Sequence, residues 1–185
     1  MRAPVSTIIV CSATAVASIA GLGAAHATDY MSVAQSQQLM FADATEFAPV
    51  NVALDPEQLR QLAERAGGPA RAGAWRVWQA RQGDKVLGYV VVDSVIGKFE
   101  LIQYAVALGT AGEIRDVEIL SYRESHGYEV RGKPWRDQFN GKSAKSTLRI
   151  GDDIQNISGA TLSCTHITDG IRRIAVMAQL ALIHP

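Results

Sequence analysis

Four strand-like segments lie close together in the middle of this chain, and they constrain its fold more than any other feature. Each is short and rich in β-branched or aromatic residues. Side chains alternate in character along the first and the last segment, and the second segment is apolar. The connections between them are short, and the one at Gln82-Gly83-Asp84-Lys85 has the composition of a hairpin turn. Hairpin-connected strands pair antiparallel, so the sequence predicts an antiparallel sheet. The four segments are residues 75–80, 86–92, 99–108 and 113–120.

Helical patterns flank the predicted sheet on both sides. Residues 32–40 suit a short helix capped by Ser32, and Asp55-Pro56-Glu57 begins a second helix that Gly67 ends. A loop through residues 43–51 is expected between them. The last segment of the chain has apolar residues at helical spacing, which predicts a C-terminal amphipathic helix and an α+β fold. These apolar residues are Ile167, Ile171, Ile174, Ala178 and Leu182.

The first 27 residues have the composition of a secretory signal peptide. Arg2 precedes an apolar, Ala-rich run, and Ala25-His26-Ala27 matches an A-x-A cleavage pattern. The run contains several Ser and Thr residues, which makes an uncleaved membrane anchor the weaker alternative. We therefore expect a periplasmic or otherwise exported protein that is cleaved after Ala27, with residues 28–185 forming a single domain.

Charge and cysteine content exclude several classes of function. Removal of residues 1–27 from the 185 leaves 158 residues, and Arg2 is the only charged residue lost from a chain with 18 basic and 18 acidic side chains. A near-neutral balance argues against nonspecific binding of nucleic acid. Cys164 is then the only cysteine, so no internal disulfide can form. It is either a reactive thiol at a helix N-terminus or, as we expect, a small buried residue. No haem or zinc motif is present.

A tight turn precedes the C-terminal helix at Ser158-Gly159-Ala160-Thr161. Small and hydroxyl-bearing residues there bring free backbone N–H groups to a helix N-terminus, which favours a phosphate. Gly159 allows the backbone to come close to a ligand. On residue type alone, an ordinary Ser/Thr helix cap explains the same residues.

Ser158-Gly159-Ala160-Thr161 followed by Leu162-Ser163 resembles the signature of the FMN-binding domain. That family includes covalent-FMN subunits of the sodium-pumping NADH:quinone reductase and of the Rnf complex, as well as small exported flavoproteins. The resemblance extends over residues 75–174, mostly as an apolar pattern. It implies that Thr161 carries FMN through a phosphoester bond, attached from FAD by a separate flavin transferase that uses a divalent metal. Gln155 stands where the family often has Asp, so noncovalent FMN binding remains an alternative.

The segment from Tyr122 to Val130 resembles the family's flavin-lining loop, with His126 in place of the usual Pro. The resemblance implies contacts to the isoalloxazine or ribityl group. Two tyrosines of this segment could pack on a ring face, or could be buried with their hydroxyls bonded. His126 could tune the flavin or relay protons. The predicted contact residues are Tyr122, Glu124, Ser125, His126, Gly127 and Tyr128, together with Ser158, Gly159, Ala160, Leu162 and Ser163 of the signature.

Three functions fit these observations to different degrees. The first is an exported flavoprotein that exchanges electrons with membrane or soluble redox proteins, rather than a stand-alone enzyme. The second is a flavin-binding or flavin-free adaptor or sensor without a redox role. The third is a hydrolase using Ser158 or Ser163. It ranks last because no G-x-S-x-G context or His–Asp partner set accompanies either serine.

Overall fold

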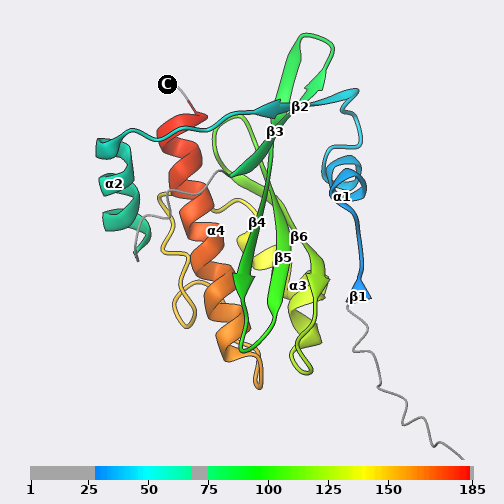
Figure 1. Ribbon diagram of the computed structural model, residues 1–185, viewed down its shortest axis with the longest axis vertical. Coiled ribbons are helices and arrows are strands. Elements are labelled where there is room, and N and C mark those ends of the chain that lie inside the picture. The colour runs from blue at the N-terminus through cyan, green and yellow to red at the C-terminus, as the bar shows by residue number, and fades with distance from the viewer. Residues whose placement is uncertain (1–27, 68–74, 184–185) are drawn as a thin grey trace, which may run out of the picture.

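The computed structural model describes residues 28–67 and 75–183 of the chain. The predicted signal peptide, residues 1–27, lies outside these ranges, so its cleavage and the export of the protein stay predictions. The predicted α+β class is confirmed. One antiparallel sheet is combined with helices on both of its faces (Figure 1).

The sheet has six strands in the order β1-β6-β5-β4-β3-β2. The four central ones correspond to the predicted strands, and each pairs antiparallel with its neighbour in sequence. Strand β4 extends to Ile96, beyond the expected end at residue 92, and β5 begins at Leu101 rather than at residue 99. The tip of this hairpin therefore consists of residues 97–100. The strands are β1 (Thr28–Asp29), β2 (Glu46–Val50), β3 (Arg76–Gln82), β4 (Lys85–Ile96), β5 (Leu101–Leu108) and β6 (Ile114–Tyr122).

The prediction of a loop through residues 43–51 was wrong, because Glu46–Val50 forms strand β2. This strand lies at the edge of the sheet and pairs only with β3, with Pro49 opposite Trp78. An edge strand tolerates proline because one side of its backbone needs no ladder hydrogen bonds. Pro49 therefore gives this segment the composition of a loop, although it is compatible with an edge strand.

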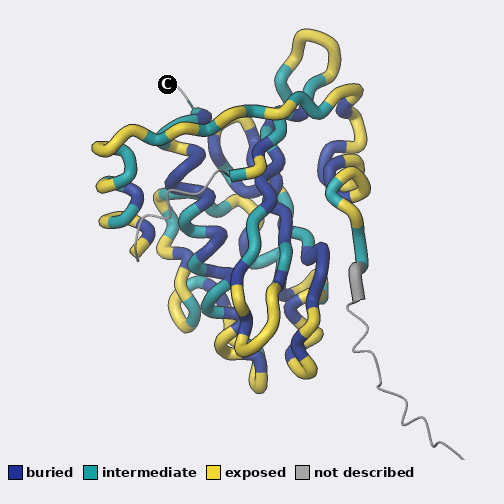
Figure 2. Tube along the Cα trace, viewed as in Figure 1, coloured by how far each residue is buried: buried dark blue, intermediate teal, exposed yellow. Residues whose placement is uncertain are grey.

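Helices cover the two faces of the sheet unequally (Figures 1 and 2). Helix α4 (Thr161–Ala181) fills one face, and α2 (Pro56–Ala66) packs beside it; together with the sheet they enclose the larger core cluster. The smaller α1 (Val33–Met40) contributes Met40 to a second cluster on the opposite face. No helix in the described ranges is both long and apolar enough to span a membrane.

The predicted helix caps are confirmed for the two N-terminal helices. The Ser32 side chain accepts a hydrogen bond from the Gln35 backbone, and that of Asp55 accepts one from the Gln58 backbone. Both glutamine side chains accept a hydrogen bond from the cap backbone, which completes a capping box at each helix.

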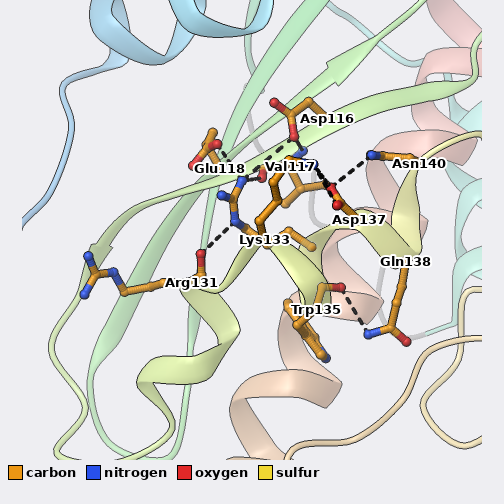
Figure 3. Close-up of polar contacts among 10 residues, drawn as sticks. Asp116, Val117, Glu118, Arg131, Lys133, Trp135, Asp137, Gln138 and Asn140 are labelled. Carbon is orange, nitrogen blue, oxygen red and sulfur yellow. Dashed lines mark hydrogen bonds and ion pairs between the residues drawn. The ribbon is translucent and has the colours of Figure 1, made fainter.

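A short helical segment packs on β6 through a buried aromatic pair and an arginine. It comprises η1 (Tyr128–Arg131), α3 (Lys133–Arg136) and η2 (Asp137–Phe139). Trp135 and Phe139 meet edge to face with ring centroids 5.2 Å apart. Arg136 forms an ion pair with Glu118 at 2.5 Å and donates to the Val117 carbonyl (Figure 3). Burial raises the pKa of Glu118 even though this guanidinium acts against the shift.

Helix α4 approaches β5 so closely that Gly170 cannot accept a side chain. A Cβ there would overlap the hydroxyl of Tyr104, which donates to Asp93 at 3.1 Å. We expect Gly170→Ala to destabilise the protein by about 1–3 kcal/mol, although alanine is the better helix former by about 1 kcal/mol. Urea unfolding measures the change.

Tyr104→Phe provides the control for that prediction, because it removes the overlapping hydroxyl. In a double-mutant cycle, Gly170→Ala should cost less in the Tyr104→Phe background than in the wild-type protein. Equal costs in the two backgrounds would contradict the close contact.

Candidate functional site

Three loops that are distant in sequence meet at one end of the molecule, the lower end in Figure 1. They are the tip of the β4–β5 hairpin, the loop after β6 and the turn that begins α4. A cavity of about 450 Å³ lies between them, within the usual size range of small-molecule sites. Its lining consists of Lys98, Phe99, Glu124, Ser125, His126, Gly159, Ala160, Thr161, Leu162 and Ser163.

The turn before α4 leaves the helix N-terminus open to a ligand. Gly159 has φ +82°, a left-handed conformation that glycine adopts without strain. Ala160 is the N-cap residue, and no side chain caps the helix, so the alternative of an ordinary Ser/Thr cap was wrong. The first turn also contains no acidic residue. Its free N–H groups and the helix dipole therefore favour an anion at this position.

Thr161 is exposed at the first position of the helix, and its hydroxyl faces the neighbouring loop. The Asn156 side-chain amide donates a hydrogen bond to Thr161 Oγ1 at 3.0 Å. This bond uses an acceptor position of the hydroxyl and leaves its proton available. The arrangement orients a nucleophilic oxygen beside the open helix end.

The loop after β6 is fixed to the turn by direct backbone contact at Gly127. This glycine has φ +81°, and a Cβ on it would overlap the Ala160 side chain and lie 2.8 Å from the Tyr122 hydroxyl. That hydroxyl donates to the His126 carbonyl at 2.6 Å and lies 3.4 Å from Ser163 Oγ. Burial raises the pKa of Tyr122. Tyr122 thus supports the loop from beneath the cavity.

The β4–β5 hairpin tip is held by the buried side chain of Glu124. Its Oε1 accepts hydrogen bonds from the backbone N–H groups of Phe99 at 2.7 Å and Glu100 at 3.0 Å. Burial alone acts to raise the pKa of this carboxyl. The backbone donors of the tip and the positive charge of Lys98 outweigh burial, and the pKa of Glu124 is lowered. The ionised carboxylate is therefore the form that holds the tip.

A second cavity of about 410 Å³ lies beside the segment 155–157 and borders Trp135. The backbone of Gln155 is fixed there, since its carbonyl accepts from Trp135 Nε1 at 2.9 Å and its N–H donates to Gln138 at 2.7 Å. The side chain of Gln155 is exposed. Gln155 therefore contributes chiefly its backbone to the structure next to Thr161.

The predicted contact residues divide into those that line the first cavity and those that support it. Tyr122 is buried with its hydroxyl bonded, which is the second of the two alternatives for this tyrosine. Tyr128 is exposed, with its ring centroid 5.7 Å from that of Tyr122. Neither tyrosine, nor Gly127 or Ser158, is part of the lining. Lys98 and Phe99 line the cavity but were not predicted from the sequence, in which they belong to a connection and to the start of a strand.

Two further residues of the first turns of α4 have structural environments. Cys164 is fully buried, and burial raises the pKa of its thiol, so the reactive-thiol alternative is not supported. His166 Nδ1 lies 2.6 Å from the Ile96 carbonyl and 3.1 Å from that of Gly97, which connects the helix to the hairpin. Within the described residues, no group of three or more acidic, His or Cys side chains is arranged to hold a metal.

The part of the chain that forms this site is similar to known proteins. Residues 97–176 match the family model of the FMN-binding domain, and this range contains all ten lining residues. The G subunit of the proton-translocating ferredoxin:NAD(+) oxidoreductase complex of Clostridium ljungdahlii is 27% identical over 133 residues, covering 68% of this chain and 72% of the relative.

Two more distant similarities were found. The G subunit of the Na(+)-translocating ferredoxin:NAD(+) oxidoreductase complex of Acetobacterium woodii is 25% identical over 129 residues, covering 64% of this chain and 62% of that protein. The crystal structure of Shewanella oneidensis NqrC aligns with 77% of this chain and 87% of its own, with a TM-score of 0.47 and 16% identity.

The two glycines of the site offer a matched pair of substitutions. Both have positive φ, but an added Cβ at Gly159 meets nothing within 4 Å, whereas at Gly127 it meets Ala160 and Tyr122. Gly159→Ala should cost about 1–2 kcal/mol of unfolding free energy from backbone strain alone. Gly127→Ala should cost about 1–3 kcal/mol more. Chemical denaturation of both variants tests the order, and a larger loss at Gly159 would contradict it.

The lowered pKa of Glu124 predicts a dependence of stability on pH. Its contribution is complete above its unfolded pKa of about 4.3 and is lost as pH falls through the lower folded value. Glu124→Gln retains an acceptor oxygen but does not titrate. The stability advantage of the wild-type protein over this variant should therefore shrink as the pH falls from about 5 to about 3. An advantage that is constant or grows on acidification would show that the carboxylate is not the stabilising form.

Proposed function

Because residues 97–176 belong to the FMN-binding domain family, we propose that this protein is a flavoprotein electron carrier whose FMN is attached to Thr161. The observation that carries the proposal is the convergence of three loops on one cavity at the open N-terminus of α4. An exposed threonine hydroxyl lies at that point. The residues around it suit the two chemically different ends of the cofactor.

The phosphate end of FMN suits the start of α4. The free N–H groups of the first turn and the helix dipole favour a phosphate, and no acidic side chain of that turn opposes it. Gly159 places no side chain between the turn and the ligand. Asn156 holds Thr161 Oγ1 at the edge of the same turn.

The isoalloxazine end suits the adjoining cavity. Phe99 and Leu162 supply apolar surface, while Ser125 and His126 supply polar groups at its edge. The His126 ring lies 2.9 Å from the Ser125 hydroxyl and is exposed to solvent. When bound, FMN supplies the electron transfer, and the protein supplies its orientation and electrostatic environment.

The covalent bond is a phosphoester to Thr161 Oγ1. In its formation the threonine oxygen displaces AMP from the phosphorus of the FMN moiety of FAD, the pyrophosphate bond breaks and the hydroxyl proton is released. A separate flavin transferase with a divalent metal catalyses this step. Exposure of the hydroxyl supports access by such an enzyme. The backbone anchoring of Gln155 is compatible with a residue other than Asp at its position, because the turn is held through main-chain groups.

We further propose that the carrier works outside the cytoplasm, in the periplasm, with redox partner proteins in a membrane or in solution. The two curated relatives are named as subunits of ferredoxin:NAD(+) oxidoreductase complexes, and this chain spans 72% and 62% of their lengths. Residues 1–27 provide the export signal in this account. A covalent tether would prevent loss of the cofactor after export.

Intact mass spectrometry tests the attachment. The full chain is co-expressed with a flavin transferase in an export-competent host, and the secreted form is purified. We expect the mass of one added FMN in the wild-type protein and none in Thr161→Ala. Thr165→Ala, one turn further along the same helix, is the matched control and should keep the added mass.

The other outcomes separate the alternatives. If denaturation releases flavin and the protein carries no added mass, the FMN is bound noncovalently and covalent attachment is contradicted. A colourless protein without added mass would contradict the flavoprotein proposal and leave the adaptor or sensor alternative. Added mass that persists in Thr161→Ala would place the attachment at another residue.

A further inference from the structure

We propose that the tip of the β4–β5 hairpin is a wall of the flavin site, formed by Lys98 and Phe99 and positioned by Glu124 and His166. This inference rests on the proposed function. It adds Lys98 as a second contacting residue beside Phe99, and it adds two positioning residues to the site. Phe99 and Lys98 lie outside both the signature at residues 158–163 and the loop at residues 122–130.

The first observation is that the tip is held from two sides by elements that form the rest of the cavity. Glu124, from the loop after β6, accepts the N–H groups of Phe99 and Glu100. His166, from α4, lies within hydrogen-bond distance of the Ile96 and Gly97 carbonyls. The loop after β6 thus bonds N–H groups of the tip, and α4 bonds its carbonyls. Together these contacts fix the position of the tip relative to both elements.

The second observation is the close packing of Gly97. A Cβ at this position would lie 2.5 Å from Glu124 Oε1 and 2.9 Å from Ser163 Oγ. A larger residue here would have to displace one of these side-chain groups, so glycine suits the close approach of the hairpin to the start of α4. The hairpin therefore borders the first turn of the helix, where the proposed phosphate attachment occurs.

The third observation is the state of the two side chains at the tip. The Phe99 side chain is 75% exposed, an unusual state for a large aromatic residue, although it lines the cavity. Lys98 Nζ lies 4.9 Å from the centre of the Phe99 ring. An aromatic ring here can cover a flat ligand, and the adjacent ammonium favours negative charge on it. Leu162, which also lines the cavity, is 47% exposed.

The test uses the flavin-loaded protein obtained by co-expression with the flavin transferase. Phe99→Ala should raise collisional quenching of flavin fluorescence by iodide and weaken the visible circular dichroism of the flavin. Lys98→Gln should shift the midpoint potential to more negative values, because a positive charge that stabilises the reduced cofactor is lost. Glu124→Ala should cause all three changes, and Glu124→Gln should restore them partly, since it keeps an acceptor oxygen for the tip.

Leu101→Ala is the matched control, because Leu101 is an exposed apolar residue of the same hairpin that does not line the cavity. It should leave all three readouts at wild-type values. If Glu124→Ala fails to fold, the substitutions at the exposed residues Lys98 and Phe99 still decide the question. A loaded protein whose quenching, dichroism and potential are unchanged by Phe99→Ala and Lys98→Gln would overturn this inference alone. A wild-type chain that carries no flavin would overturn it together with the proposed function.

Discussion

The packing of α4 against the sheet is the interaction on which the rest of this structure depends. Ile167, Ile171 and Ile174 are fully buried against the strands, and Gly170 brings the helix backbone next to Tyr104. Such a close-packed interface tolerates little shift along or around the helix axis. The packing that builds the core therefore also fixes where the helix begins, and with it the position of Thr161.

The site is assembled around that fixed point by contacts of backbone with side chain. Gly127 lies against Ala160, Gly97 lies against Ser163, and Glu124 joins the hairpin tip to the loop after β6. Each contact links two of the three loops, so no wall of the cavity is positioned independently of the others. A cofactor that needs a phosphate at one end and a flat apolar surface at the other finds both in this small volume. The chain thus combines a rigid core with a site made almost entirely of loops, as many binding proteins do.

Much of this arrangement could be predicted from the sequence, because local patterns specify it. The caps at Ser32 and Asp55, the central strands and the helical spacing from Ile167 onward all follow from neighbouring residues. Strand β2 could not be recognised, because Pro49 is typical of a loop and only its edge position makes it acceptable. Lys98 and Phe99 could not be predicted as site residues for a different reason. They join the site through Glu124, 25 residues away from Phe99, and no local pattern records such a hydrogen bond.

The position of the flavin ring in a crystal structure of the loaded protein tests the central claim most directly, because two cavities flank the segment that leads to Thr161. Our account predicts the phosphate at Thr161 and the isoalloxazine in the cavity between Phe99, Glu124 and Leu162. A ring placed instead in the cavity beside Trp135 and Gln155, or a phosphate bonded away from the start of α4, would contradict it.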